Sequence, residues 1–193
     1  MDAALLPLAR TSLRDPRAAA KTIMGLSLGR DVLWTALGLV AIVNTFLVLL
    51  VVEVSGPSIP LPGYFDRPLA LFILIAGLTV VYVHAMYWAG MAIGGQGSLM
   101  DVLALVVWFQ MLRAAAQAMV IVVSFLIPPL GALASLAVAV WGIWIFLNFL
   151  AAALHLSSPW HAIAVLVVAF VGLVLGLGIL MALIGTLSQG VMS

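Results

Sequence analysis

The sequence predicts an all-α membrane protein with five transmembrane helices and an N-terminal interfacial amphipathic segment. Of its 193 residues, 66% are hydrophobic and 7% are charged, whereas soluble domains carry about 25% charged residues. The mean hydropathy is +1.36. A soluble fold could not cover this much apolar surface, so we expect the chain to cross a membrane several times.

Five apolar segments are each long enough to cross a hydrocarbon core of about 30 Å, which needs about 20 helical residues. The breaks between them contain glycine, proline or serine, where helices end and begin. The expected spans are 32–54, 69–93, 101–127, 130–154 and 160–187. They form one domain over 32–188, between an N-terminal arm (1–31) and a short tail (189–193). The spans are long, so we expect them to be tilted.

Polar residues mark three of the helix starts. Asp31 can cap the first span. Ser98 and Asp101 have the spacing of a capping box for the third. Ser158 followed by Pro159 suits the N-cap and first helical position of the fifth. Capping is therefore the expected role of the two aspartates.

The N-terminal arm holds five of the seven basic residues of the chain: Arg10, Arg14, Arg17, Lys21 and Arg30. Asp15-Pro16 can begin a short helix and Gly25 can end it, with Ala20 and Ile23 on an apolar face. Such a segment is expected to lie on the membrane surface, against anionic lipid or a cytoplasmic partner. The positive-inside rule places the N-terminus in the cytoplasm and, after five spans, the C-terminus in the periplasm.

Four segments are typical of one family of membrane proteins: DPRAAAKTIMGL (15–26), a proline-bearing loop (55–68), GGQGSLMDVLALVVW (94–108) and the tight turn IPPL (127–130). In these segments the chain resembles the bacterial branch of the Yip1-domain family. The resemblance covers essentially the whole chain, including the five-span layout. The resemblance implies a five-helix, multi-pass protein of the bacterial inner membrane with a cytoplasmic N-terminus, and it implies no reaction.

A polar stripe crosses the third span. Gln110, Arg113 and Gln117 are spaced i, i+3, i+7, so they share one helical face. Arg113 lies about 18 Å into the span, near mid-membrane. An arginine at that depth costs about 2.5–3.5 kcal/mol on insertion scales, so we expect it to face the bundle interior or water.

Other spans carry polar residues at compatible depths, namely Asn44, His84 and Asn148. The amides could accept hydrogen bonds from Arg113, because no carboxylate is expected at its depth. Three roles follow for this cluster. It can hold helices together, bind an anion or lipid headgroup, or relay protons through His84.

Small residues predict close helix packing. Gly172 and Gly176 form a GxxxG in the fifth span, and Gly131, Ser135 and Ala139 follow at four-residue spacing in the fourth. We expect internal contacts between helices, with a homodimer seam as the alternative.

The histidines give no metal site. His155 and His161 stand six residues apart with no carboxylate or thiol nearby, and the chain has no cysteine, so we expect no metal and no cofactor. The sequence also lacks a P-loop, a nucleophile motif and a carboxylate pair, and nothing in it favours nucleic-acid binding.

These patterns favour a non-enzymatic integral membrane protein. The expected role is membrane organisation, or service as an accessory that binds lipid or another membrane protein. The alternative is a small transporter or channel for an anion or polar solute that uses the Gln110, Arg113 and Gln117 stripe. A membrane-embedded enzyme is a third, less favoured interpretation.

Overall fold

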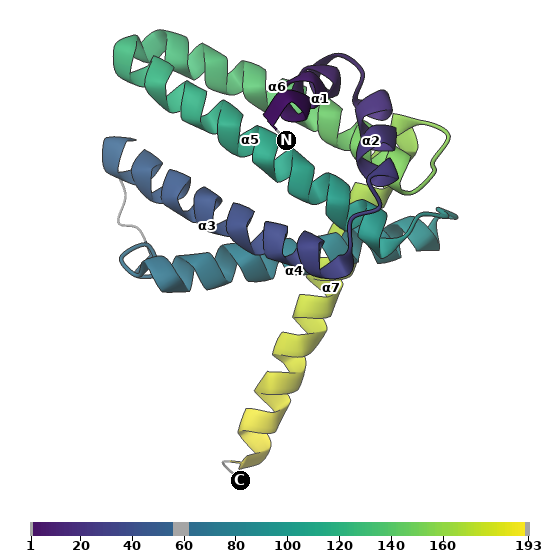
Figure 1. Ribbon diagram of the computed structural model, residues 1–193. Helices are drawn as coiled ribbons and strands as arrows, with labels where there is room; N and C mark the ends of the chain where they lie inside the picture. The colour runs from purple at the N-terminus through teal and green to yellow at the C-terminus, as the bar shows by residue number, and fades with distance from the viewer. Residues whose placement is uncertain (1, 56–61, 192–193) are drawn as a thin grey trace.

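The computed structural model describes residues 2–55 and 62–191, with side chains within 5–53 and 62–179. The expected loop 55–68 and the tail 189–193 therefore lie partly outside the described residues. Within the described ranges the chain is helical and contains no strand (Figure 1). The helices are α1 (Asp2–Arg14), α2 (Pro16–Gly25), α3 (Arg30–Ser55), α4 (Pro68–Ala92), α5 (Leu99–Leu126), α6 (Pro128–Ala153) and α7 (Pro159–Val191).

The five long helices confirm the predicted spans. α3 to α7 are each long and apolar enough to cross a membrane. Each begins within two residues of the expected start. Only α7 differs appreciably, because it continues to Val191 instead of ending near 187.

The predicted helix starts are confirmed at two of three places. The Ser98 hydroxyl accepts from the Asp101 N–H at 3.1 Å and the Asp101 carboxylate accepts from the Ser98 N–H at 3.2 Å, which completes the capping box. Pro159 is the first residue of α7. The prediction for Asp31 is wrong, because α3 already begins at Arg30 and Asp31 lies within its first turn. A carboxylate in the first turn still stabilises the helix, because it lies near the positive end of the helix dipole.

The bundle has two ends, which we define by the N-terminal arm. At the arm end lie α2 and the starts of α3, α5 and α7, and at the far end lie the starts of α4 and α6 (Figure 1). α5 and α6 make the most extensive contact between spans, and α3 packs on α5.

The core lies toward the arm end. Seven consecutive residues of α5, from Val102 to Trp108, are buried, and so are residues 148–151 of α6. The buried residues of α3 stop at Thr45, and every later side chain up to Glu53 is exposed or half-buried. Figure 1 shows the α3–α4 and α5–α6 hairpins spreading apart toward the far end.

Glycines in the loop 94–98 allow it to pack against the end of α6. The Gln96 N–H donates to the Leu154 carbonyl at 3.0 Å. A Cβ on Gly97 would overlap the carbonyl oxygen of Ala153, and Gly94 has a φ of +90°. The loop glycines therefore serve packing and chain reversal.

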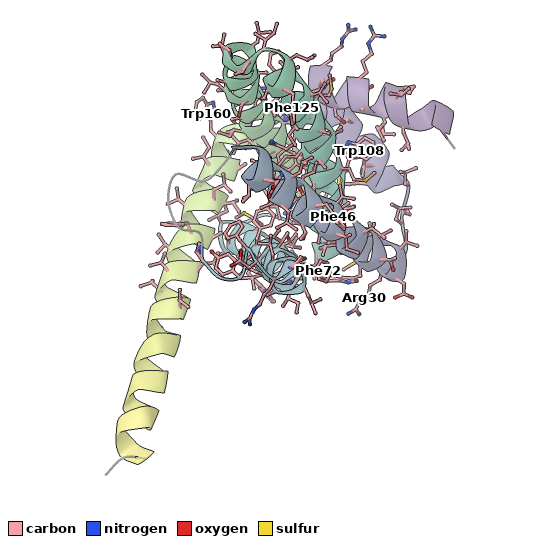
Figure 2. All side chains as sticks on the ribbon, turned by 90° about the vertical axis from the view of Figure 1, so that its left-hand side faces the viewer. Arg30, Phe46, Phe72, Trp108, Phe125 and Trp160 are labelled. Atoms are coloured by element: carbon pink, nitrogen blue, oxygen red, sulfur yellow. The ribbon has the colours of Figure 1, made fainter. Side chains whose placement is uncertain are left out.

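The GxxxG of α7 makes no close contact with the described residues. α7 packs on α4 and α6 with its first part and then runs away from the bundle (Figures 1 and 2). Gly172 and Gly176 are exposed, and a Cβ on either would meet nothing within 4 Å. The prediction that they pack internally is wrong, and contact with a second copy stays a prediction.

The small residues of α6 are used only at the far end. Gly131 is buried, and an added Cβ would overlap Ser124 of α5. Ser135 and Ala139 are exposed. The predicted close packing is therefore limited to one turn.

The N-terminal arm packs against the bundle. Asp15 accepts from the Ala18 N–H at 3.0 Å and α2 ends at Gly25, as predicted. Ala20 and Ile23 are buried in the main core, where α2 meets α5 and α6. The apolar face expected to touch lipid is thus covered by protein.

Candidate functional site

Arg113 joins α5 to α3 near the middle of the bundle. Its Nη2 donates to Asn44 Oδ1 at 2.8 Å, and its Nε donates to Gln110 Oε1 at 3.0 Å. These are two of the partners expected from sequence. The contact lies where the buried part of α3 ends, since Asn44 and Thr45 are the last buried residues of that helix.

Asn44 is positioned by its own helix. It is 4% exposed, and its Nδ2 donates to the Val40 carbonyl one turn back at 2.9 Å. That bond fixes the amide so that Oδ1 points away from α3 and accepts from Arg113. Both ends of the side chain are therefore satisfied, as a buried amide requires.

Both hydrogen bonds of the Arg113 side chain go to neutral amide oxygens. A guanidinium has five N–H donors, so three make no hydrogen bond to the residues that the structure describes. The side chain is exposed, and no ion pair forms between the described residues around it. Glu53 lies about 13.5 Å further along α3 than Asn44, at 1.5 Å per residue.

A small cavity adjoins the cluster. It lies between α3, α4 and α5, has a volume of about 10 Å³, and includes Asn44, Thr79 and Gln110 in its lining. This volume is near the lower limit for one water molecule. The space can hold a hydrating water and is too small for a polar solute.

Three predicted members of the cluster, His84, Asn148 and Gln117, make no hydrogen bond to Arg113 among the described residues. His84 Nδ1 lies 2.8 Å from the carbonyl oxygen of Val80 in the same helix, and its ring stacks on Trp34 with 6.2 Å between the ring centroids. Asn148 donates to its own Trp144 carbonyl at 2.9 Å. Gln117 is half-buried and makes no side-chain hydrogen bond to the described part of the chain. None of the three therefore forms a hydrogen bond with Arg113 in the described part of the chain, and their membership of the cluster stays a prediction.

An aromatic group missed by the sequence reasoning borders the site. The ring centroids of Tyr82 (α4) and Phe146 (α6) lie 5.8 Å apart, and those of Phe146 and Phe109 (α5) lie 5.2 Å apart. Phe109 directly precedes Gln110, which accepts a hydrogen bond from Arg113. Aromatic residues give little periodic signal in a span that is apolar on all sides, so this cluster had no distinctive pattern.

His155 and His161 lie at the arm end of the bundle. His155 has a φ of 53° and follows the end of α6, and His161 is in the first turn of α7, where its Nδ1 lies 3.4 Å from the Ser157 hydroxyl. Among the described residues, no group of three metal-ligating side chains occurs.

Five continuous apolar helices, one of which carries an arginine held by amides, define a polytopic integral membrane protein. The family model of the Yip1 domain matches residues 10–183, so the chain belongs to the Yip1-domain family. Comparisons with curated proteins and with solved structures return no match.

Proposed function

We propose that this Yip1-domain protein is a non-enzymatic accessory of the bacterial inner membrane that binds an anionic lipid at Arg113. One observation carries the proposal. The Arg113 side chain is bonded to two neutral amides and leaves three N–H donors without a protein partner among the described residues. A guanidinium with free donors matches the oxygens of a phosphate.

The energies favour a further partner. An arginine at the bilayer centre costs about 2.5–3.5 kcal/mol, which is an upper limit for Arg113. Side-chain hydrogen bonds in membranes contribute about 0.6 kcal/mol on average, so two of them offset only about 1.2 kcal/mol. An anionic headgroup would supply the remaining stabilisation, at most about 2 kcal/mol by difference of these values.

The transporter alternative has less support. The cavity beside Arg113 is about 10 Å³, and the five spans are continuous helices. A solute path along the Gln110, Arg113 and Gln117 stripe would have to open through the core between Val102 and Trp108. Transporter sites are usually built where helices are interrupted.

Native mass spectrometry of protein released from its own membranes tests the proposal. Wild type is compared with Arg113→Leu and with Arg67→Leu, a control that removes an exposed arginine in the loop before α4. We expect wild type and the control to retain a phospholipid that Arg113→Leu loses. Identical spectra for the three proteins, with only Arg113→Leu less stable, would show that the arginine holds helices together and binds nothing.

A further inference from the structure

Two tryptophan N–H groups attach the C-terminal end of α1 to the spans, and Leu8 and Ala9 of α1 pack against the core. Trp108 Nε1 of α5 donates to the Ser12 hydroxyl at 2.9 Å, and Ser12 is fully buried. Trp141 Nε1 of α6 donates to the Leu13 carbonyl at 3.2 Å. From this attachment α1 extends away from the bundle, crosswise to α5 and α6 (Figure 2).

The free surface of α1 has an apolar side beside a basic side. Leu5, Leu6 and Leu13 are exposed, Leu6 by 78%. At about 100° per residue these leucines occupy an arc of about 100°. Arg10 and Arg14, both exposed, occupy about the next 80°. α1 leaves the bundle crosswise and carries leucines beside arginines. Such a helix suits a membrane interface, where the apolar side faces acyl chains and the basic side faces headgroups.

The length of α5 agrees with this placement. Trp108 lies about 13.5 Å from the start of α5 at Leu99, at 1.5 Å per residue. From Trp108 to Leu126 the helix is about 27 Å long, close to a hydrocarbon core of about 30 Å. Trp108 binds α1, which carries Arg10 and Arg14. Because arginines are costly in hydrocarbon, Trp108 fits a position at the edge of that core.

The tryptophans mark the same region. All six lie in the half of their helix nearer the arm end: Trp34, Trp88, Trp108, Trp141, Trp144 and Trp160. Tryptophan is enriched at membrane–water interfaces. The hydrogen bond from Trp141 to the Leu13 carbonyl links Trp141 to the arm.

We propose that α1 lies in the headgroup layer of the arm-end leaflet, with its leucines among acyl chains and its arginines on anionic phosphates. The hydrogen bonds from Trp108 and Trp141 to α1 set the position of this headgroup layer along α5 and α6. Arg113 then stands about 7.5 Å beyond Trp108, within the same leaflet. If the proposed function also holds, the lipid at Arg113 comes from that leaflet.

Single cysteines introduced into this cysteine-free chain test the level of α5. Met111→Cys and Met119→Cys sit on exposed positions of the same helix, about 4.5 and 16.5 Å beyond Trp108. Each is spin-labelled in phosphatidylcholine vesicles, and its depth is measured from oxygen and nickel-chelate accessibility. We expect position 119 to be near the bilayer centre and 111 to be shallow. If α5 were instead centred in the bilayer, position 111 would be the deeper one, and that result would overturn the proposal.

A third label, on Leu6→Cys, tests the lipid contact of α1. In vesicles that contain phosphatidylglycerol we expect the label to lie at headgroup depth. In an Arg10→Gln, Arg14→Gln background we expect its depth no longer to depend on phosphatidylglycerol. If the label were water-accessible both with and without phosphatidylglycerol, α1 would not contact lipid. The exposed leucines would then be available to a soluble partner instead. Arg113→Leu should change none of these depths, so a failure of the Arg113 lipid site is distinguishable from a failure here.

Discussion

The hydrogen bond between Arg113 and Asn44 should couple α5 to α3 by about 1 kcal/mol. Hydrogen bonds to charged groups contribute about 1.5–3 kcal/mol in soluble proteins, whereas double-mutant cycles in a membrane protein average about 0.6 and reach about 1.7. A charged donor at 2.8 Å from a buried amide belongs in the upper half of the membrane range. Arg113→Leu, Asn44→Leu and the double variant form the cycle, read as free energies of unfolding in mixed dodecyl maltoside and dodecyl sulfate micelles.

Asn148→Leu provides the matched control for this cycle. Asn148 is also a buried asparagine in a span, but it donates to its own helix and makes no hydrogen bond with Arg113. Its cycle with Arg113→Leu should be additive within about 0.5 kcal/mol. If the Asn44 cycle were equally additive, the bond would contribute nothing measurable, and Arg113 would not be what holds α3 to α5.

Two further predictions concern packing. Gly97→Ala should destabilise the protein by more than 1 kcal/mol, on the order of the cost of overpacking, because a Cβ would overlap the Ala153 carbonyl. Gly172→Ala should leave the same micelle unfolding curve unchanged or slightly stabilised, since nothing lies within 4 Å. Trp108→Phe and Ser12→Ala should each cost about 1 kcal/mol in that assay, with less than the sum lost in the double variant. A fully additive double variant would contradict the bond.

The spans could be predicted because hydropathy and helix-breaking residues both act locally. The capping box at Ser98 and the proline at 159 are readable for the same reason. α1 was missed because it is short, holds Pro7 in its first turns and mixes leucine with arginine. A helix of that kind is stable through its contacts with other segments, which composition does not report.

The site was predictable in part, because depth alone does not decide which polar groups meet. Asn44 and Gln110 contact Arg113, whereas Asn148 and His84 bond the carbonyl four residues earlier in their own helices. A short polar side chain within a span can be satisfied locally in this way. Only the rotation of each helix decides which side chain reaches a neighbour, and apolar residues on every face leave that rotation unspecified.

Hydropathy also could not show what covers each part of a span. α5 has 28 residues and is about 42 Å long, which exceeds a hydrocarbon core of about 30 Å. The sequence suggests tilt for such an excess. The structure offers another explanation, because α2 and the loop 94–98 enclose the first turns of α5 and the last turns of α6, where Val102–Trp108 are buried in protein. Apolar side chains leave water equally well into protein or into lipid. The first part of α5 can therefore be as hydrophobic as the rest without lying in the membrane, and Arg113 can be central in its helix without being central in the bilayer.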